Sequence, residues 1–206
     1  EEAKRLEAER LAQEAAERKK KEEEILYLKE HTIGRNDCRL FIDEPSRRIQ
    51  IFYKDKEITA AGGLHSTLPL SELVDRGFEL KKISEDHLVL KLHFSMLTQI
   101  WDMVFQEDNV LSIKIELEVK ERIFLEKRYL LFELLNIYQK WQTSYEKGNL
   151  ASGQYMNEIA PVRFKNSRVY SVALSSKETA QPKVAFEISS SDNYLAGLSK
   201  RKVGEH

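Results

Sequence analysis

Apolar and polar residues alternate most strictly in two runs within Gly77–Trp141, and these runs predict β-strands. Apolar residues occupy every second position of the first run (Leu88, Leu90, Leu92 and Phe94). In the second run, Lys or Glu fills each intervening position (Ile113, Ile115, Leu117 and Val119). Such alternation places one set of side chains on a buried sheet face and the other set in water. The centre of the chain therefore predicts an antiparallel sheet with one solvated side.

Short predicted strands separated by turns continue on the N-terminal side of this centre. A turn at residues 44–47 joins strands at 38–43 and 48–53, and a second tight turn leads into 57–59. Gly62–Ser66 is expected to break the strand pattern, because two adjacent glycines permit unusual backbone angles. These signals are typical of a meander of short antiparallel strands.

Further strands and turns extend the pattern toward the C-terminus, after a loop with a helical turn expected at Leu70–Arg76. The additional strands are predicted at 78–83, 87–94, 97–105, 110–125, 162–164, 168–174 and 183–188. Trp101, which is set among apolar residues, is expected in the core. We therefore predict a mainly β chain with an antiparallel β-sandwich at 37–198 and a flexible tail at 199–206.

A long charged helix is predicted for residues 1–30, which contain no Gly or Pro and consist almost entirely of strong helix formers. Leu6 and Leu11 lie five residues apart, which fits no coiled-coil seam. Two interpretations stay open: a solvated helical spacer, or the end of a longer coiled coil that makes the protein a homo-oligomer. Gly34, in the segment His31–Gly34, is expected to end the helix.

The segment Lys127–Trp141 fits either a helix or a strand. Apolar and aromatic residues fall on one face of a helix (Leu131, Leu134, Leu135, Tyr138 and Trp141). However, the segment follows a strand without a capping residue, and Tyr129–Leu135 also suits a fully buried strand. Periodicity alone favours the helix.

Composition and charge argue against several classes of partner and of protein. The 206 residues include 33 basic and 34 acidic ones, which gives a net charge of −1, so no overall positive field favours nucleic acid. No apolar run approaches the roughly 18 residues of a membrane span. Cys38 is the only cysteine, which excludes an internal disulfide and is compatible with a cytoplasmic location. The chain begins with two glutamates and no Met, so we expect a segment of a longer protein.

The sequence holds no motif that identifies a reaction. A Gly-rich phosphate loop, a nucleophile elbow and a His-pair zinc motif are all missing, so we expect no cofactor and no metal. His87 and His93 are interpreted as hydrated surface residues. His65 follows two glycines and is either an ordinary surface residue or an imidazole presented at the edge of a cleft.

An aromatic cluster points to one class of ligand. Tyr138, Trp141 and Tyr145 precede a Gly-containing loop in which Tyr155 lies, and amide side chains are nearby (Gln139, Gln142, Asn149 and Gln154). Sugars stack on aromatic rings while polar side chains bind their hydroxyl groups. These four aromatic residues, with His65, form the predicted carbohydrate-binding site. In the alternative interpretation, Tyr138 and Trp141 are core residues that pack on the sheet.

The order of features from Asp37 to about Gly148 resembles a known family. The features are Arg39–Asp43, Arg48–Tyr53, Lys56–Thr59, Gly63–Ser66, Ile100–Trp101, Ile113–Val119 and Tyr138–Trp141. The order resembles β-sandwich domains attached to bacterial glycan-handling proteins and is similar to the galactose-mutarotase-like supersandwich, over a little more than half of the chain. The resemblance implies a large sandwich with a strand at Tyr129–Asn136. Mutarotases use a His and an acidic residue as acid and base, a pair that the resemblance does not place here.

Three hypotheses for function follow. The first is a non-catalytic accessory domain that binds a saccharide or polysaccharide and is joined by its helix to an upstream enzyme of polysaccharide synthesis or modification. The second is a structural module that oligomerises and positions protein partners. The third is an enzyme of the mutarotase or glycoside-processing class that uses His65 and a carboxylate.

Overall fold

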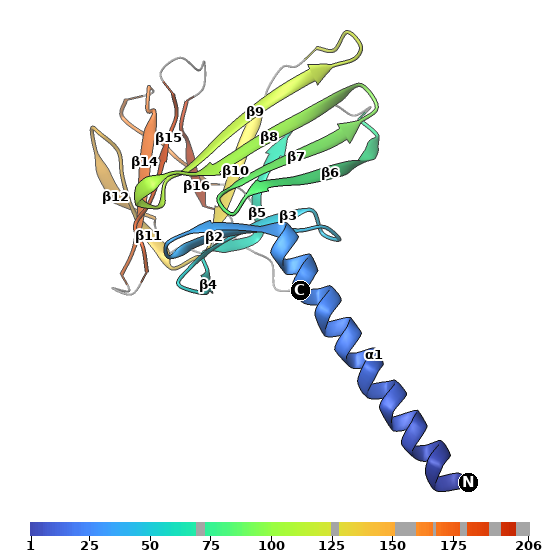
Figure 1. The fold of residues 1–206 in the computed structure, drawn as a ribbon. Helices are drawn as coiled ribbons and strands as arrows, with labels where there is room; N and C mark the ends of the chain where they lie inside the picture. Colours follow the sequence, from blue (N-terminus) through green and yellow to red (C-terminus); the bar gives the residue numbers. More distant parts are fainter. Residues whose placement is uncertain are drawn as a thin grey trace. The chain divides into compact units, whose positions relative to one another are not determined.

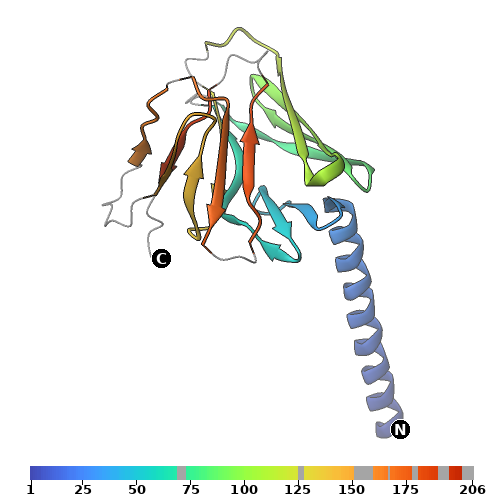
Figure 2. The ribbon, with the colours of Figure 1, turned by 90° about the vertical axis from the view of Figure 1, so that its left-hand side faces the viewer.

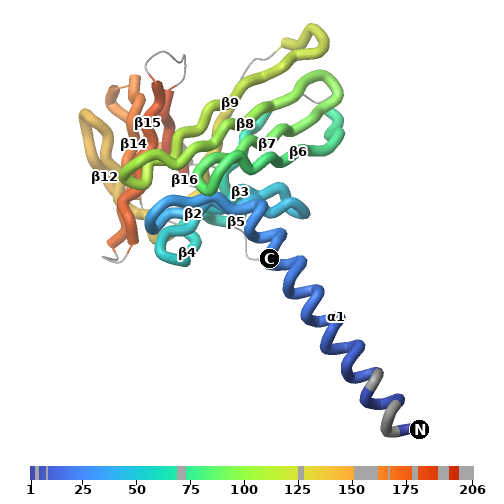
Figure 3. The backbone as a smooth tube through the Cα atoms, viewed as in Figure 1, coloured from blue at the N-terminus to red at the C-terminus, as the bar shows by residue number. Residues whose placement is uncertain are grey.

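The computed structural model describes residues 1–68, 73–124, 128–150, 160–166, 168–177, 181–189 and 195–200 (Figure 3). The chain divides into two compact units, Glu1–Glu133 and Leu134–His206, which we call unit 1 and unit 2 and describe separately. The division falls within 37–198, the range for which the sequence predicts one β-sandwich domain.

Unit 1 consists of helix α1 (Glu2–His31) and two β-sheets (Figure 1). The first sheet has the strand order β1-β2-β3-β5-β10, with β4 paired to β3 (β1 Thr32–Arg35, β2 Cys38–Asp43, β3 Arg48–Tyr53, β4 Lys56–Glu57, β5 Thr59–Thr67 and β10 Tyr129–Leu134). The second sheet is the antiparallel meander β6-β7-β8-β9 (β6 Asp75–Ser84, β7 His87–Phe94, β8 Leu97–Phe105 and β9 Leu111–Val119). The 3₁₀ helix Glu107–Asn109 connects β8 to β9. The prediction of a mainly β chain with antiparallel sheets and one N-terminal helix is confirmed.

The two alternating runs form β7 and β9, on either side of β8. The register places Leu90 opposite Trp101 and Trp101 opposite Ile115, so the apolar positions of three strands share one face. Met103 and Trp101 of β8 are 0% and 1% exposed. Because side chains alternate between the faces of a sheet, this register also assigns the Lys and Glu side chains of β9 to the opposite face.

Strand β5 passes through Gly62–Ser66, so the expected break in the sheet is wrong. Gly63 has a φ of 59°, and a Cβ there would stand well inside contact distance of the Ile49 carbonyl oxygen. A Cβ on Gly62 would collide with the carboxylate of Glu133 on β10, which accepts a hydrogen bond from the Gly62 amide (3.2 Å). The two glycines therefore allow close approach on either side of a strand instead of ending it.

Helix α1 extends away from the sheets of unit 1 as a charged rod (Figure 2). All side chains described between Glu1 and Leu26 are exposed. Ion pairs three or four residues apart link neighbouring turns (Arg5–Glu9, Arg10–Glu7, Arg10–Glu14, Arg18–Glu22 and Lys19–Glu23). Such pairs each stabilise a helix by about 0.2–0.5 kcal/mol, so the rod gains stability from its own surface.

The last turn of α1 is fixed to unit 1 by a joint centred on Tyr27 and His31. Their rings stack with centroids 4.0 Å apart, and the Tyr27 ring meets Phe41 of β2 edge-on at 6.2 Å. The Glu44 amide donates to the Tyr27 hydroxyl (3.0 Å). Lys82 of the other sheet donates to the Lys29 carbonyl (3.1 Å). Both sheets of unit 1 therefore bind the end of the rod.

The chain passes from helix to strand between His31 and Thr32, without a glycine cap. Thr32 already has extended angles (φ −117°, ψ 133°), and Gly34 lies within β1. The prediction that Gly34 ends the helix is wrong. The His31 imidazole lies 2.8 Å from the Tyr27 carbonyl oxygen and binds one of the last carbonyls of the helix in place of a backbone cap.

The helix favoured for Lys127–Trp141 is also wrong. Tyr129–Leu134 forms β10, and Tyr138–Gln142 forms a strand of unit 2. The pairing of β10 with β5, and of β11 with β12 and β14, overrides the helical spacing, as happens when tertiary contacts outweigh local periodicity.

Unit 2 contains a four-stranded sheet and a strand pair. The sheet has the order β12-β11-β14-β15 (β11 Tyr138–Gln142, β12 Lys147–Asn149, β14 Ser171–Ser176 and β15 Val184–Glu187), and the pair joins β13 (Ala160–Val162) to β16 (Leu198–Lys200). Residues 199 and 200, where the predicted tail begins, thus lie in a strand, and 201–206 lie outside the described residues. The predicted turn at Leu70–Arg76 lies largely outside them too, and β6 begins at Asp75.

We expect Gly63→Ala to lower the free energy of unfolding by about 2–4 kcal/mol, because the methyl group meets backbone at a positive φ. Gly77→Ala is the matched control, since Gly77 has a φ of 116° but nothing within 4 Å of its added Cβ. It should cost about 1 kcal/mol. Urea unfolding of both variants measures the difference, and equal costs would show that the contact with Ile49 does not constrain β5.

Candidate functional site

Strands β11 and β12 form a hairpin whose turn is organised by Thr143. The Thr143 hydroxyl accepts hydrogen bonds from the amides of Tyr145 (3.2 Å) and Glu146 (3.1 Å). The Thr143 amide donates to the Glu146 carbonyl (2.8 Å). Thr143 is itself only 7% exposed. Its buried hydroxyl therefore fixes the turn and holds the backbone of Tyr145 in place.

The inward face of this hairpin buries two of the predicted sugar-binding aromatics. Tyr138 and Trp141 are 3% and 8% exposed. The Trp141 ring lies against Gly148, where an added Cβ would stand 2.5 Å from the indole, and 5.2 Å from the Phe164 ring between centroids. Burial raises the pKa of Tyr138 to about 12. This burial favours the alternative interpretation, in which Tyr138 and Trp141 are core residues that pack on the sheet.

The outward face of the hairpin is polar and carries one exposed aromatic ring. Tyr145 is 66% exposed at the turn. The register pairs Gln142 with Lys147 and Lys140 with Asn149, and all four of these side chains are exposed. We call Lys140, Gln142, Tyr145, Lys147 and Asn149 the hairpin face. Two amides, two ammonium groups and a phenol ring there offer donors, acceptors and a stacking surface in a small area.

Two predicted site residues, Tyr155 and His65, remain. Tyr155 lies outside the described residues. His65 belongs to β5 of unit 1, and its Nδ1 lies 3.2 Å from the Gly62 carbonyl oxygen. The Glu133 carboxylate binds the amide of the same glycine, a convergence that sequence spacing could not show because β10 comes from 71 residues away along the chain.

His87 and His93 are half-buried and paired, so their interpretation as hydrated surface residues is corrected. His87 Nε2 lies 2.7 Å from Asp102 Oδ1 on β8. His93 lies 3.3 Å from both Thr98 and Glu79. These are cross-strand contacts on one sheet, and they place the imidazoles in the structure of unit 1.

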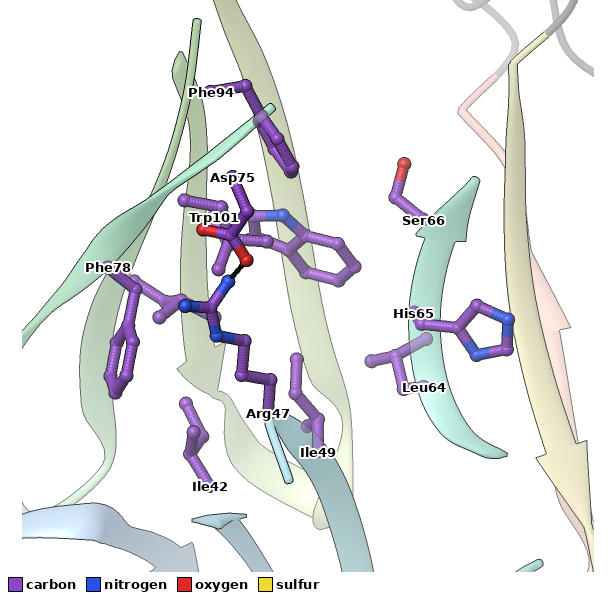
Figure 4. A pocket seen from close by; sticks show the side chains of 12 residues that line it. Ile42, Arg47, Ile49, Leu64, His65, Ser66, Asp75, Phe78, Phe94 and Trp101 are labelled. Atoms are coloured by element: carbon purple, nitrogen blue, oxygen red, sulfur yellow. Dashed lines mark ion pairs between the residues drawn. The ribbon is translucent and has the colours of Figure 1, made fainter. Parts of the chain in front are cut away.

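Unit 1 contains a cavity of about 250 Å³ that the sequence analysis did not predict (Figure 4). Side chains from both sheets line it (Ile42, Arg47, Ile49, Leu64, His65, Ser66, Asp75, Phe78, Leu90, Leu92, Phe94 and Trp101). Trp101 is confirmed as a core residue, and one side of its ring forms part of the wall. The only advance signal was the Gly62-Gly63 pair, which lets β5 run close to β3 and so sets Leu64 and Ser66 on the cavity wall.

Among the described residues, no three His, Cys, Asp or Glu side chains could together hold a metal ion. No helix in the described part is both long and apolar enough to cross a membrane. No protein-family model, curated protein or solved structure matches the chain. The resemblance to glycan-handling sandwich domains therefore stays a prediction.

We expect Trp141→Ala to destabilise unit 2 by about 3–5 kcal/mol, because it removes a buried ring and leaves a cavity beside Phe164. Tyr145→Ala should change stability by less than about 0.5 kcal/mol, since its ring is exposed. Thermal and urea unfolding followed by tyrosine and tryptophan signals compares the two. If Trp141→Ala lowered the stability of unit 2 as little as Tyr145→Ala does, the Trp141 ring would not be a core anchor.

Proposed function

We propose that this chain is a non-catalytic accessory module that binds a saccharide through the hairpin face of unit 2 and is carried on a helical rod. The observation that supports the proposal most is that β11 has one buried face and one exposed face with different roles. Trp141 points into the core and fixes the strand, while Gln142 and the adjacent turn present amide, ammonium and phenol groups to solvent. Rigid aromatic and amide groups of this kind suit sugar recognition.

The charge of the hairpin face favours an acidic saccharide. Lys140 and Lys147 lie on adjacent strands, each register-paired with an amide residue. A carboxylate or sulfate on a sugar would gain from both ammonium groups, and ions in solution would weaken that gain. A neutral sugar would retain only stacking and amide hydrogen bonds.

The rest of the chain is consistent with an accessory role. In the proposal, unit 1 follows the rod along the chain and unit 2 follows unit 1, while an upstream polysaccharide-synthesis or -modifying enzyme precedes the rod. Burial and then the charge of Asp37 raise the pKa of the Cys38 thiol, so it is a poor nucleophile. A cytoplasmic location is part of the proposal. Catalysis by His65 is not part of the proposal, because its Nδ1 already faces a backbone carbonyl.

Calorimetric or NMR titration with acidic and neutral oligosaccharides tests the proposal. We expect millimolar or tighter binding of a polyuronate fragment, about tenfold weaker binding by Tyr145→Ala, and a comparable loss for Lys140→Gln with Lys147→Gln. Raising the salt concentration should weaken the binding of the acidic oligosaccharide more than that of the neutral one. Tyr170→Ala is the matched control, since Tyr170 is 41% exposed in unit 2 but lies off the hairpin. If no saccharide binds at millimolar concentration, the proposal fails.

The joint of α1 favours a second candidate function, a rigid module that positions protein partners. Hydrogen bonds from both sheets and the Tyr27–His31 stack hold the rod at its base. The part of α1 before the joint, about 24 residues long, would span roughly 36 Å at 1.5 Å per residue. Oligomerisation through residues 1–30 belongs to this candidate, since Leu6, Leu11 and Ile25 are all more than half exposed.

A rigid rod predicts a narrow distribution of distances between spin labels at Gln13→Cys and Glu118→Cys in a Cys38→Ala background. Tyr27→Ala should broaden the distribution, because it removes the stack and the bond to Glu44, whereas Leu26→Ala, on the exposed side, should not. Pulsed electron paramagnetic resonance measures both. A broad distance distribution in the labelled chain with Tyr27 unaltered would contradict rigid positioning. Distances between labels on different chains that appear as the protein concentration rises would reveal oligomers.

A further inference from the structure

The cavity of unit 1 lies outside the hairpin face and has a chemistry of its own. Its wall is built mainly from apolar side chains of both sheets, including Trp101, Leu64 and Ile49, which are 1%, 2% and 3% exposed. The space of about 250 Å³ lies between the two sheets and is partly open to solvent.

The charged groups of the cavity neutralise each other. Arg47, from the turn before β3, forms an ion pair with Asp75 of β6 across the cavity (Figure 4). The Arg47 guanidinium also lies 5.7 Å from the centre of the Phe78 ring. The His65 ring points away from the cavity. The described wall thus presents no unpaired charge to a ligand.

One polar atom in the wall is left without a partner. Ser66 follows Leu64 on the cavity side of β5 (Figure 4), and its hydroxyl is buried with no hydrogen-bond partner among the described residues. A buried hydroxyl without a partner is unfavourable. A ligand in the cavity would relieve this cost if it carried one hydrogen-bonding group.

We propose that the cavity binds an uncharged ligand consisting of a single apolar ring with one hydroxyl group. An apolar cavity of about 150 Å³ is enough for benzene, so the larger space here accommodates a substituted ring. The aromatic and aliphatic wall holds the ring, Ser66 binds the hydroxyl, and the Arg47–Asp75 pair lies at the polar side. This site is independent of the saccharide site, because all of its lining residues belong to unit 1.

Titration of the full chain with 4-methylphenol and with toluene, followed by heteronuclear NMR, tests this site. We expect both probes to shift the Trp101 indole and Leu64 methyl signals, with 4-methylphenol the tighter ligand. Ser66→Ala should weaken 4-methylphenol about three- to tenfold and leave toluene unchanged, because only the former loses a hydrogen bond. Tyr145→Ala should alter neither titration.

A cavity-filling change provides a second test. Leu92→Trp should abolish binding of both probes, and if that variant does not fold, Ser66→Ala alone decides. The proposal is overturned if neither probe shifts these signals, if Ser66→Ala binds 4-methylphenol as the unaltered chain does, or if 4-hydroxybenzoate binds as tightly as 4-methylphenol. None of these outcomes depends on saccharide binding, so the two proposals fail separately.

Discussion

The burial of β8 is the constraint on which the rest of unit 1 depends. Leu97, Trp101, Met103 and Phe105 are at most 1% exposed, and β7 and β9 pair with β8 along its length. Because strand side chains alternate, a register slip of one residue would move this whole apolar set to the other face. The register in turn sets the positions of Leu90 beside the cavity and of Lys82 at the base of the rod, one strand further out.

Alternation within single strands was the part of the fold that could be predicted from sequence. The bounds of β2, β3, β7 and β8 match the predicted ranges, because each has a strong period-2 pattern between clear turn residues. The predictions for Gly62–Ser66 and for Lys127–Trp141 were wrong for the same physical reason. Their conformations are set by residues distant in sequence, namely Ile49 and Glu133 for the glycines and the paired strands for Tyr138–Gln142. The boundary between the units at residue 133 likewise depends on contacts made across the sheets.

The candidate site shows the same limit at the level of single side chains. Proximity in sequence grouped Tyr138, Trp141 and Tyr145, but once β11 is a strand, Trp141 and Gln142 must face opposite ways. The structure buries Trp141 and exposes Gln142. If residues 138–142 had been predicted as a strand, the alternation of side chains would have separated the buried Trp141 from the exposed Gln142. For the cavity, the Gly62-Gly63 pair was the only signal in the sequence, since the cavity wall comes from two sheets.

Trp101 is a core residue of unit 1 and Trp141 is a core residue of unit 2, and we propose that saccharide recognition belongs to exposed groups around Tyr145. Collisional quenching of tryptophan fluorescence by acrylamide tests this most directly. With Trp101 and Trp141 only 1% and 8% exposed, both should resist quenching in the folded chain and become fully quenchable on unfolding. A strongly quenched component in the folded chain, traced to Trp141 by its loss in Trp141→Phe, would contradict the account and restore Trp141 as a surface that a sugar could stack on.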